Sequence, residues 1–103
     1  MGLRMYIVLA EDLPVEYAPV TAAHASVTAV LMWGEDPIMQ KWMEESFAKV
    51  VVKAPLDRFP LLRARGDNIQ LTESKLESRV TALVFKVVEE PPGALRSLPL
   101  WKP

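Results

Sequence analysis

A few residues in this sequence have side chains that could carry out chemistry. His24 is the only histidine, so it is the single imidazole that could move a proton near neutral pH. Thr72, Glu73 and Ser74 form the densest polar cluster, in which a carboxylate and two hydroxyl groups could orient a water molecule. Asp12 follows a short apolar run, and a carboxylate at the end of a buried strand is well placed to meet a ligand. These residues are the candidate site.

Each candidate also has a purely structural interpretation. His24 lies on a helical stripe of aliphatic residues, which predicts a buried histidine that is hydrogen-bonded within the core. The other members of that stripe are Val20, Val27 and Leu31. The cluster at residues 72–74 consists of residue types that favour turns, and Asp12 can end a strand for conformational reasons alone. The residues by themselves leave both interpretations open.

The composition excludes several kinds of site. The 103 residues include 12 basic and 13 acidic side chains, and this net charge of -1 argues against a nucleic-acid binder that relies on a strong overall positive field. With no cysteine and one histidine, the chain has no disulfide, cysteine-ligated zinc, thiolate nucleophile, iron–sulfur cluster or pair of histidine ligands. The four glycines lie far apart, so there is no phosphate-binding or dinucleotide-binding loop. We therefore expect no metal and no cofactor.

Apolar runs and breakers predict the elements that must position these side chains. A buried strand is expected at residues 5–10, a helix at 20–33 that ends at Gly34, and a second helix that Asp36 caps. The remaining predicted elements are a buried strand at 48–53, a short helix near Phe59, an edge strand at 68–72, a strand at 79–88, and a closing segment whose Leu95, Leu98, Leu100 and Trp101 pack on the body.

This order of elements predicts a single domain over residues 1–103. Half of the residues are hydrophobic, and a chain of this size buries roughly 65% of its unfolded surface, which is enough for one core. The order is typical of an α/β fold, and we expect a three-layer α/β/α sandwich around a four-stranded sheet that is mostly parallel or mixed. The apolar run at 5–10 is too short for a signal peptide or a membrane span, so we expect a cytoplasmic protein with no membrane partner.

Several short motifs occur in one order along nearly the whole chain. They are residues 5–10 with Asp12-Leu13, Ala22-Ala23-His24-Ala25, Lys41-Trp42 with residues 47–53, and the tail at 91–100. This order resembles the type II peptidyl-tRNA hydrolases, whose opening strand ends in Asp-Leu and whose first helix carries alanines around a histidine. The resemblance implies hydrolysis of the ester bond of peptidyl- or acyl-tRNA, with tRNA as a partner.

Two motifs of that family are absent. The family carries a Gly-Lys pair just before the first helix, whose lysine is held to act in catalysis, whereas this sequence has Glu16-Tyr17-Ala18-Pro19. The family's Asp-Ala-Gly-Arg-Thr motif is also missing, and the nearest positions, 70–75, read QLTESK. If another cation fills the place of the lysine, Lys53 and Arg79 are the candidates.

The resemblance assigns roles to the candidate residues. His24 carries the proton, while Glu73, Thr72 or Ser74 holds the water or the ester carbonyl. The residues expected to bind the substrate are Asp12, Lys53 and Arg79. The alternative hypothesis is a non-catalytic domain of the same fold that binds tRNA, a small ligand or a protein partner, and the missing lysine favours it.

Basic and aromatic residues suggest further surfaces. Six basic residues could form one patch for tRNA phosphates or lie scattered over a solvated surface. They are Arg58, Arg63, Arg65, Lys75, Arg79 and Arg96. Trp33, Trp42 and Trp101 could stack on bases, but their apolar neighbours favour packing in a core or an interface. The amount of apolar helix surface on so small a body also predicts a homodimer.

Overall fold

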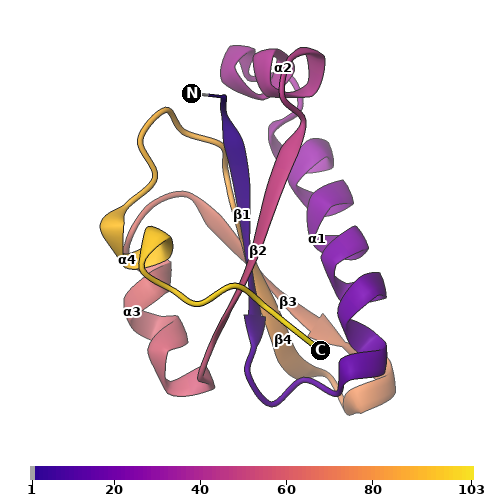
Figure 1. Ribbon diagram of the computed structural model, residues 1–103. Coiled ribbons are helices and arrows are strands. Elements are labelled where there is room, and N and C mark those ends of the chain that lie inside the picture. Colours follow the sequence, from indigo (N-terminus) through magenta and orange to yellow (C-terminus); the bar gives the residue numbers. More distant parts are fainter. Residues whose placement is uncertain (1) are drawn as a thin grey trace.

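The protein is built on a mixed sheet of four strands (Figure 1). The computed structural model describes residues 2–103, and its strands are β1 (Arg4–Ala10), β2 (Ala48–Ala54), β3 (Asn68–Glu73) and β4 (Arg79–Phe85), in the order β2-β1-β4-β3. β1 and β2 pair in parallel, whereas β4 runs antiparallel to both of its neighbours. The prediction of a mixed sheet is confirmed. The alternative of a mostly parallel sheet is wrong, because two of the three strand pairings are antiparallel.

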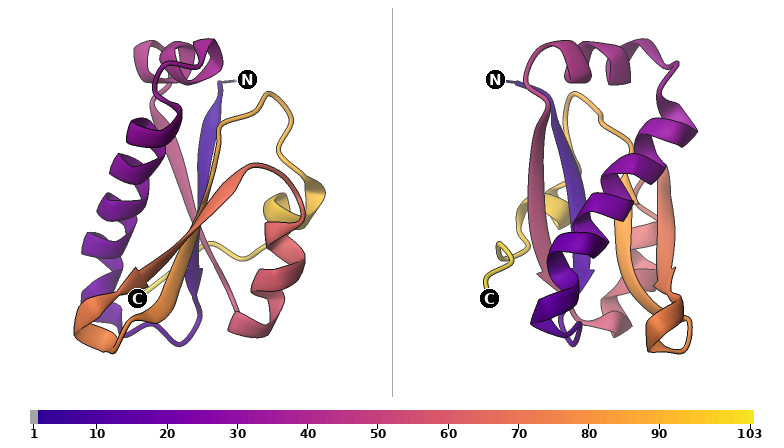
Figure 2. Two further views of the ribbon diagram at one scale, coloured as in Figure 1. Left: turned by 180° about the vertical axis from the view of Figure 1, so that it is seen from behind. Right: turned by 90° about the vertical axis from the view of Figure 1, so that its right-hand side faces the viewer.

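Helices flank the sheet, which confirms the α/β character of the fold. In Figures 1 and 2, α1 (Ala18–Trp33) crosses one face of the sheet, while the short α3 (Phe59–Arg63) and α4 (Gly93–Arg96) lie on the other side. α2 (Pro37–Glu44) lies across the end of the sheet at which β1 begins. The connections contain three short 3-10 helices, which are η1 (Val15–Tyr17), η2 (Leu56–Arg58) and η3 (Ser74–Leu76).

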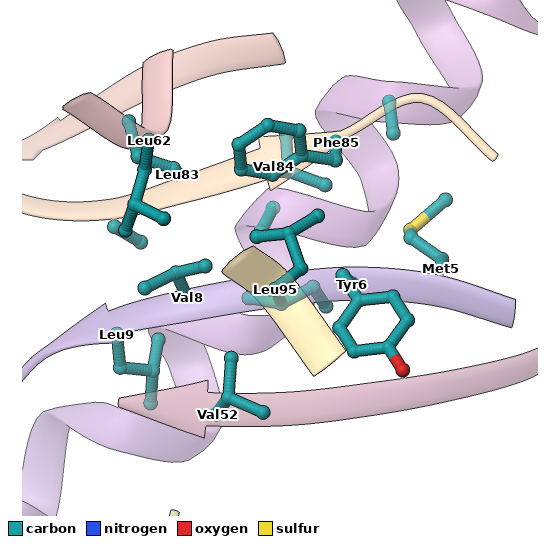
Figure 3. Close-up of a cluster of buried hydrophobic side chains, with 14 of the residues drawn as sticks. Met5, Tyr6, Val8, Leu9, Val52, Leu62, Leu83, Val84, Phe85 and Leu95 are labelled. Carbon is teal, nitrogen blue, oxygen red and sulfur yellow. The ribbon is translucent and has the colours of Figure 1, made fainter. Parts of the chain in front are cut away.

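β1 forms the centre of the core. All of its side chains at residues 5–10 are buried, as the apolar run predicts for a strand covered on both faces. The neighbouring strand β4 is buried over residues 81–85. Figure 3 shows Tyr6 and Val8 of β1 close to Leu95 of α4, so α4 closes the core on this side of the sheet.

β2 is less buried than its run of valines predicts. Only Val52 and Ala54 of this strand are buried, because β2 lies at the edge of the sheet, with β1 as its one neighbouring strand. A strand buried on both faces needs cover from helices on each side, and the main contacts of α1 are instead with β1, β3 and β4. The prediction of a fully buried strand here is therefore wrong, although the strand itself is confirmed.

The closing segment covers part of the free edge of β2. The backbone N–H of Lys53 donates to the carbonyl oxygen of Pro99 at 3.0 Å, and the N–H of Trp101 donates to that of Val51 at 2.9 Å. Leu95 is buried, and Leu98 and Trp101 are partly buried, as predicted. Leu100 is exposed, so its predicted packing is wrong: it forms a bridge to β2 through its backbone, and its side chain lies in solvent.

α1 packs on the sheet through its smallest side chains. The buried residues of this helix are Ala18, Thr21, Ala25 and Ala29. They recur every three or four residues and form one face, and their small size lets the helix backbone approach the sheet closely. The stripe of larger residues around His24 points the other way, into solvent. The interpretation of His24 as a buried structural residue is therefore wrong.

The turn from α1 to α2 depends on Gly34 and Asp36. Gly34 ends α1 as predicted, but with a right-handed φ of -62°, so it is not the left-handed cap that glycine commonly forms. A Cβ atom at this position would lie 2.4 Å from the carbonyl oxygen of Val30, so the close approach requires glycine. Asp36 caps α2 as predicted, because its Oδ1 accepts a hydrogen bond from the N–H of Ile38 at 3.1 Å.

Candidate functional site

Three of the four strands end at the same edge of the sheet, which we call the carboxyl edge. β1, β2 and β3 run in one direction, and β4 runs against them, so the residues after those three strands lie near the start of β4. Asp12 follows β1, Glu73 ends β3 and Arg79 begins β4. The carboxyl edge lies at the lower end of the sheet in Figure 1. Ligands of open α/β sheets bind outside this edge, which makes it the candidate site.

Asp12 and Arg79 form an ion pair at the carboxyl edge. The Nη2 atom of Arg79 lies 3.1 Å from Oδ2 of Asp12 and donates to the backbone carbonyl oxygen of the same residue at 2.6 Å. Because both side chains are partly exposed, the pair contributes only on the order of 0–1 kcal/mol to stability. Its main consequence is geometric. It fixes the guanidinium through one nitrogen atom and ties the loop after β1 to the first residue of β4.

The connection from β3 to β4 places Glu73 next to Arg79. The two residues are partners in the register of the antiparallel pair, which shifts between Leu71 and Thr72. Glu77 and Ser78 follow η3 with left-handed φ angles of 57° and 58°, a conformation that is costly for residues other than glycine. The N–H of Ser78 then donates to the carbonyl oxygen of Glu73 at 3.0 Å, which closes the turn.

The Glu73 carboxylate is held by its own turn. Its Oε2 accepts hydrogen bonds from the backbone N–H of Lys75 at 3.3 Å and from the hydroxyl of Ser74 at 3.5 Å. The side chain is half-buried, so it is partly shielded and still reaches solvent. A carboxylate in this position can accept a proton from a bound water molecule.

A shallow hollow lies between the segments that follow β1 and β2. It is lined by Glu11, Asp12, Pro55 and Leu56, and the N–H of Glu11 donates to the carbonyl oxygen of Ala54 at 2.9 Å, which joins the two segments. Glu11, Pro55 and Leu56 are not among the site residues predicted from the sequence. The signal was present, because both segments follow strands that were expected to lie side by side.

The other predicted site residues lie around this edge or away from it. Thr72 and Ser74 are exposed beside Glu73, and Lys53 is half-buried one residue before the end of β2. His24 lies on the outer face of α1, exposed, and its ring has no hydrogen-bond partner within residues 2–103. The structure therefore brings together Asp12, Glu73 and Arg79, with Thr72 and Ser74 alongside, and places His24 on a separate surface.

Four of the six basic residues lie at two ends of the sheet. Lys75 and Arg79 lie at the carboxyl edge, whereas Arg65 and Arg96 line two hollows that share Arg4, at the start of β1. Arg63 is held by Asn68, whose Oδ1 accepts from its Nε at 3.1 Å. The basic residues thus do not form one patch.

The tryptophans pack within the fold, as predicted. Trp42 is fully buried, and its indole N–H donates to the carbonyl oxygen of Ala48 at 2.7 Å. Trp33 and Trp101 are partly buried against the core. Base stacking on these rings is therefore not supported by their positions.

Two further features are absent from the described part of the chain. Over residues 2–103, no group of three or more histidine, cysteine or acidic side chains could hold a metal ion. None of the helices in this range is long and apolar enough to cross a membrane.

Comparison with known proteins leaves the family resemblance a prediction. No protein-family model matches the chain, and no curated protein matches it either.

Proposed function

We propose that the protein is a hydrolase similar to the type II peptidyl-tRNA hydrolases, which cleaves the ester bond of peptidyl- or acyl-tRNA at the carboxyl edge. The observation that carries this proposal is that Glu73 and Arg79 are partners in the register of β3 and β4, at the edge where β1, β2 and β3 end, with Arg79 also paired to Asp12. The order of motifs along the sequence supports it, as does the mixed sheet. The three-layer arrangement and a cytoplasmic location belong to the same proposal.

In this proposal Glu73 activates the attacking water. The carboxylate accepts one proton from the water molecule while the oxygen of that water bonds to the ester carbonyl carbon. This step forms a tetrahedral oxyanion. The bond from that carbon to the ribose oxygen then breaks, and the protonated Glu73 returns its proton to the leaving oxygen. Ser74 and the N–H of Lys75 hold the carboxylate in place. Thr72 and Ser74 remain the candidates that hold the water.

Arg79 supplies the positive charge that the missing lysine would have provided. Both contacts of its guanidinium with Asp12 use Nη2, so Nη1 and Nε remain to bind the oxyanion or a phosphate of the tRNA. Lys53 is a less direct candidate, because it lies within β2 rather than beyond its end.

His24 keeps its predicted role as proton carrier only if the tRNA reaches from the carboxyl edge to the outer face of α1. The ring of His24 is exposed on the outer face of α1, so a substrate can contact it only on that face. The activity test therefore treats Glu73 and His24 separately.

The test is hydrolysis of diacetyl-lysyl-tRNA by the wild type and by Glu73→Gln. We expect kcat/KM of the variant to fall by about 100-fold or more, because the amide cannot accept the proton. Glu44→Gln, an equivalent change of an exposed carboxylate on α2, serves as the control and should stay within about twofold of the wild type. Full activity of Glu73→Gln would remove Glu73 from the site. His24→Ala with unchanged activity would remove the role of His24 and leave that of Glu73.

A second function is favoured by the ion pair itself. Asp12 neutralises much of the charge of Arg79, and the lysine expected from the resemblance is absent, which suits a domain that binds without catalysis. In that case the folded wild type shows no turnover and still binds deacylated tRNA, with an affinity that falls as salt increases. Absence of both turnover and binding would contradict both proposals.

A further inference from the structure

The outer face of α1 is apolar and exposed along its whole length. The helix has 16 residues and not one charged side chain. Val20, Val27 and Leu31 are 43%, 57% and 82% exposed. In the right-hand view of Figure 2, α1 crosses the front of the sheet and no other element covers it. Helices on a protein surface normally carry charged residues on their outer face, so the composition of α1 is that of a helix with cover on both sides.

The exposed residues form a narrow stripe. Val20, His24, Val27 and Leu31 are spaced by four, three and four residues, so they lie within an arc of about 60° and extend over about 16 Å of the helix. This spacing is the one through which two helices pack against each other. Ala23, beside the stripe, is small enough to let a second helix backbone approach.

We propose that a second copy of this chain covers the stripe, with the two α1 helices packed antiparallel across a two-fold axis. This inference does not depend on the proposed hydrolase activity. The stripe carries no charged side chain, so it has no partner of opposite charge to select, and no like charges meet within it when it packs against its own copy. A two-fold axis makes the same patch serve both chains.

The antiparallel direction follows from the sizes of the residues. The axis passes between His24 and Val27, so Val20 of one chain lies against Leu31 of the other, and His24 lies against Val27. Each contact then pairs a larger side chain with a smaller one. In a parallel arrangement Leu31 would meet Leu31 and Val20 would meet Val20, which leaves uneven gaps. The antiparallel arrangement also brings opposite ends of the two helix dipoles together.

The available area indicates a weak dimer. A fully exposed valine, leucine or methionine side chain offers roughly 60–120 Å². The stripe and its flanking residues then offer on the order of 400 Å² per chain, or about 800 Å² in the pair, which is below the ~1,200 Å² of a stable interface. The pair should therefore dissociate on dilution.

The test is sedimentation equilibrium of the wild type between roughly 1 µM and 1 mM. The average mass should rise with concentration from 11.6 kDa toward twice that value. Leu31→Glu should raise the dissociation constant at least tenfold, because it places a charge in the contact. Leu61→Glu is the matched control, since Leu61 is also an exposed leucine but lies on α3, and it should leave the dissociation constant unchanged.

A double variant determines the direction of the helices. Val20→Lys should weaken the dimer as Leu31→Glu does. The two changes in one chain should weaken the dimer less than the two single effects combined, because the introduced ammonium then lies opposite the introduced carboxylate of the other copy. In a parallel pair like charges would meet, and the double variant would be weaker than the two single effects combined. A wild type that stays at 11.6 kDa throughout, an unaffected Leu31→Glu, or a double variant at least as weak as the combined single effects overturns the proposal.

Discussion

Two ion pairs lie at opposite ends of β4, and they differ in what they leave free. Arg79, the first residue of the strand, pairs with Asp12 at the carboxyl edge, and Lys86, just after the last residue, pairs with Asp36 beside α2. The side chains of Lys86 and Asp36 are 21% and 33% exposed, whereas those of Arg79 and Asp12 are 36% and 60% exposed. The pair beside α2 is the more enclosed of the two.

The difference in hydrogen bonding is equally clear. Asp36 accepts from both Lys86 and the N–H of Ile38, and the ion pair with Lys86 holds the pKa of Asp36 below its ordinary value. Each of its two carboxylate oxygens has a partner, and together they join α2 to the end of β4. Arg79 meets Asp12 through one of its nitrogens, so part of its guanidinium can still bind a ligand. Of the two cations at the ends of β4, Lys86 therefore has a structural role, whereas Arg79 is a candidate for binding a ligand.

The largest expected effect separates the two cations. Arg79→Ala should lower kcat/KM for diacetyl-lysyl-tRNA by about 100-fold, because it removes the charge that we propose stabilises the oxyanion, and should change the thermal midpoint little. Lys86→Ala should lower the midpoint and keep kcat/KM within about twofold. Equal loss of activity in both variants would show that the division between the two pairs is wrong.

A smaller effect on stability separates the two carboxylates. Asp36→Ala removes the helix cap and the ion pair together, and should lower the denaturation midpoint more than Asp12→Ala does. Asp36→Asn should fall between Asp36→Ala and the wild type, because its amide oxygen still accepts from the N–H of Ile38. Thermal denaturation of the three variants measures this order. A variant at Asp12 that is the least stable of the set would reverse the comparison.

The smallest effect is a dependence of stability on pH. The pKa of Asp36 is lowered from 3.8 by Lys86, so its contribution is fully present above about pH 5 and is lost as pH falls through the lowered value. The pKa of Lys86 is raised from 10.5 by Asp36, so its contribution is present below that value and is lost only in stronger alkali. Denaturation midpoints measured from about pH 7 down to about pH 2 should fall further for the wild type than for Asp36→Asn. Parallel curves for the two proteins would show that the ion pair contributes nothing.

Local signals in the sequence were enough to predict the elements. The apolar run at residues 5–10, bounded by Glu11-Asp12, identified the central strand, and Asp36-Pro37 identified the start of α2. Both signals depend on residues close together in the chain. The edge position of β3 also followed from its weak alternation of apolar and polar residues.

The face of α1 could not be predicted, because periodicity alone does not decide between two uncharged faces. The stripe around His24 is the more hydrophobic of the two faces. The face that packs on the sheet is nevertheless the one with the smaller side chains, because these let the helix approach more closely. The ion pair between Asp12 and Arg79 could not be predicted either, because the two residues are 67 positions apart and only the strand order brings them together. The left-handed residues Glu77 and Ser78 gave no signal, because glycine is absent from that turn.

The closing segment makes the two sides of the sheet unequal toward an incoming strand. Backbone groups of Val51 and Lys53 on the outer side of β2 are already occupied by residues 99–101, whereas the outer side of β3 has no neighbouring strand within residues 2–103. Strand addition between copies is therefore favoured along β3 over β2, whose edge is partly covered. Two chains joined along β3 would present outward only their β2 sides, on which the closing segment already occupies part of the edge. Growth into a fibril would then be disfavoured after the first pairing.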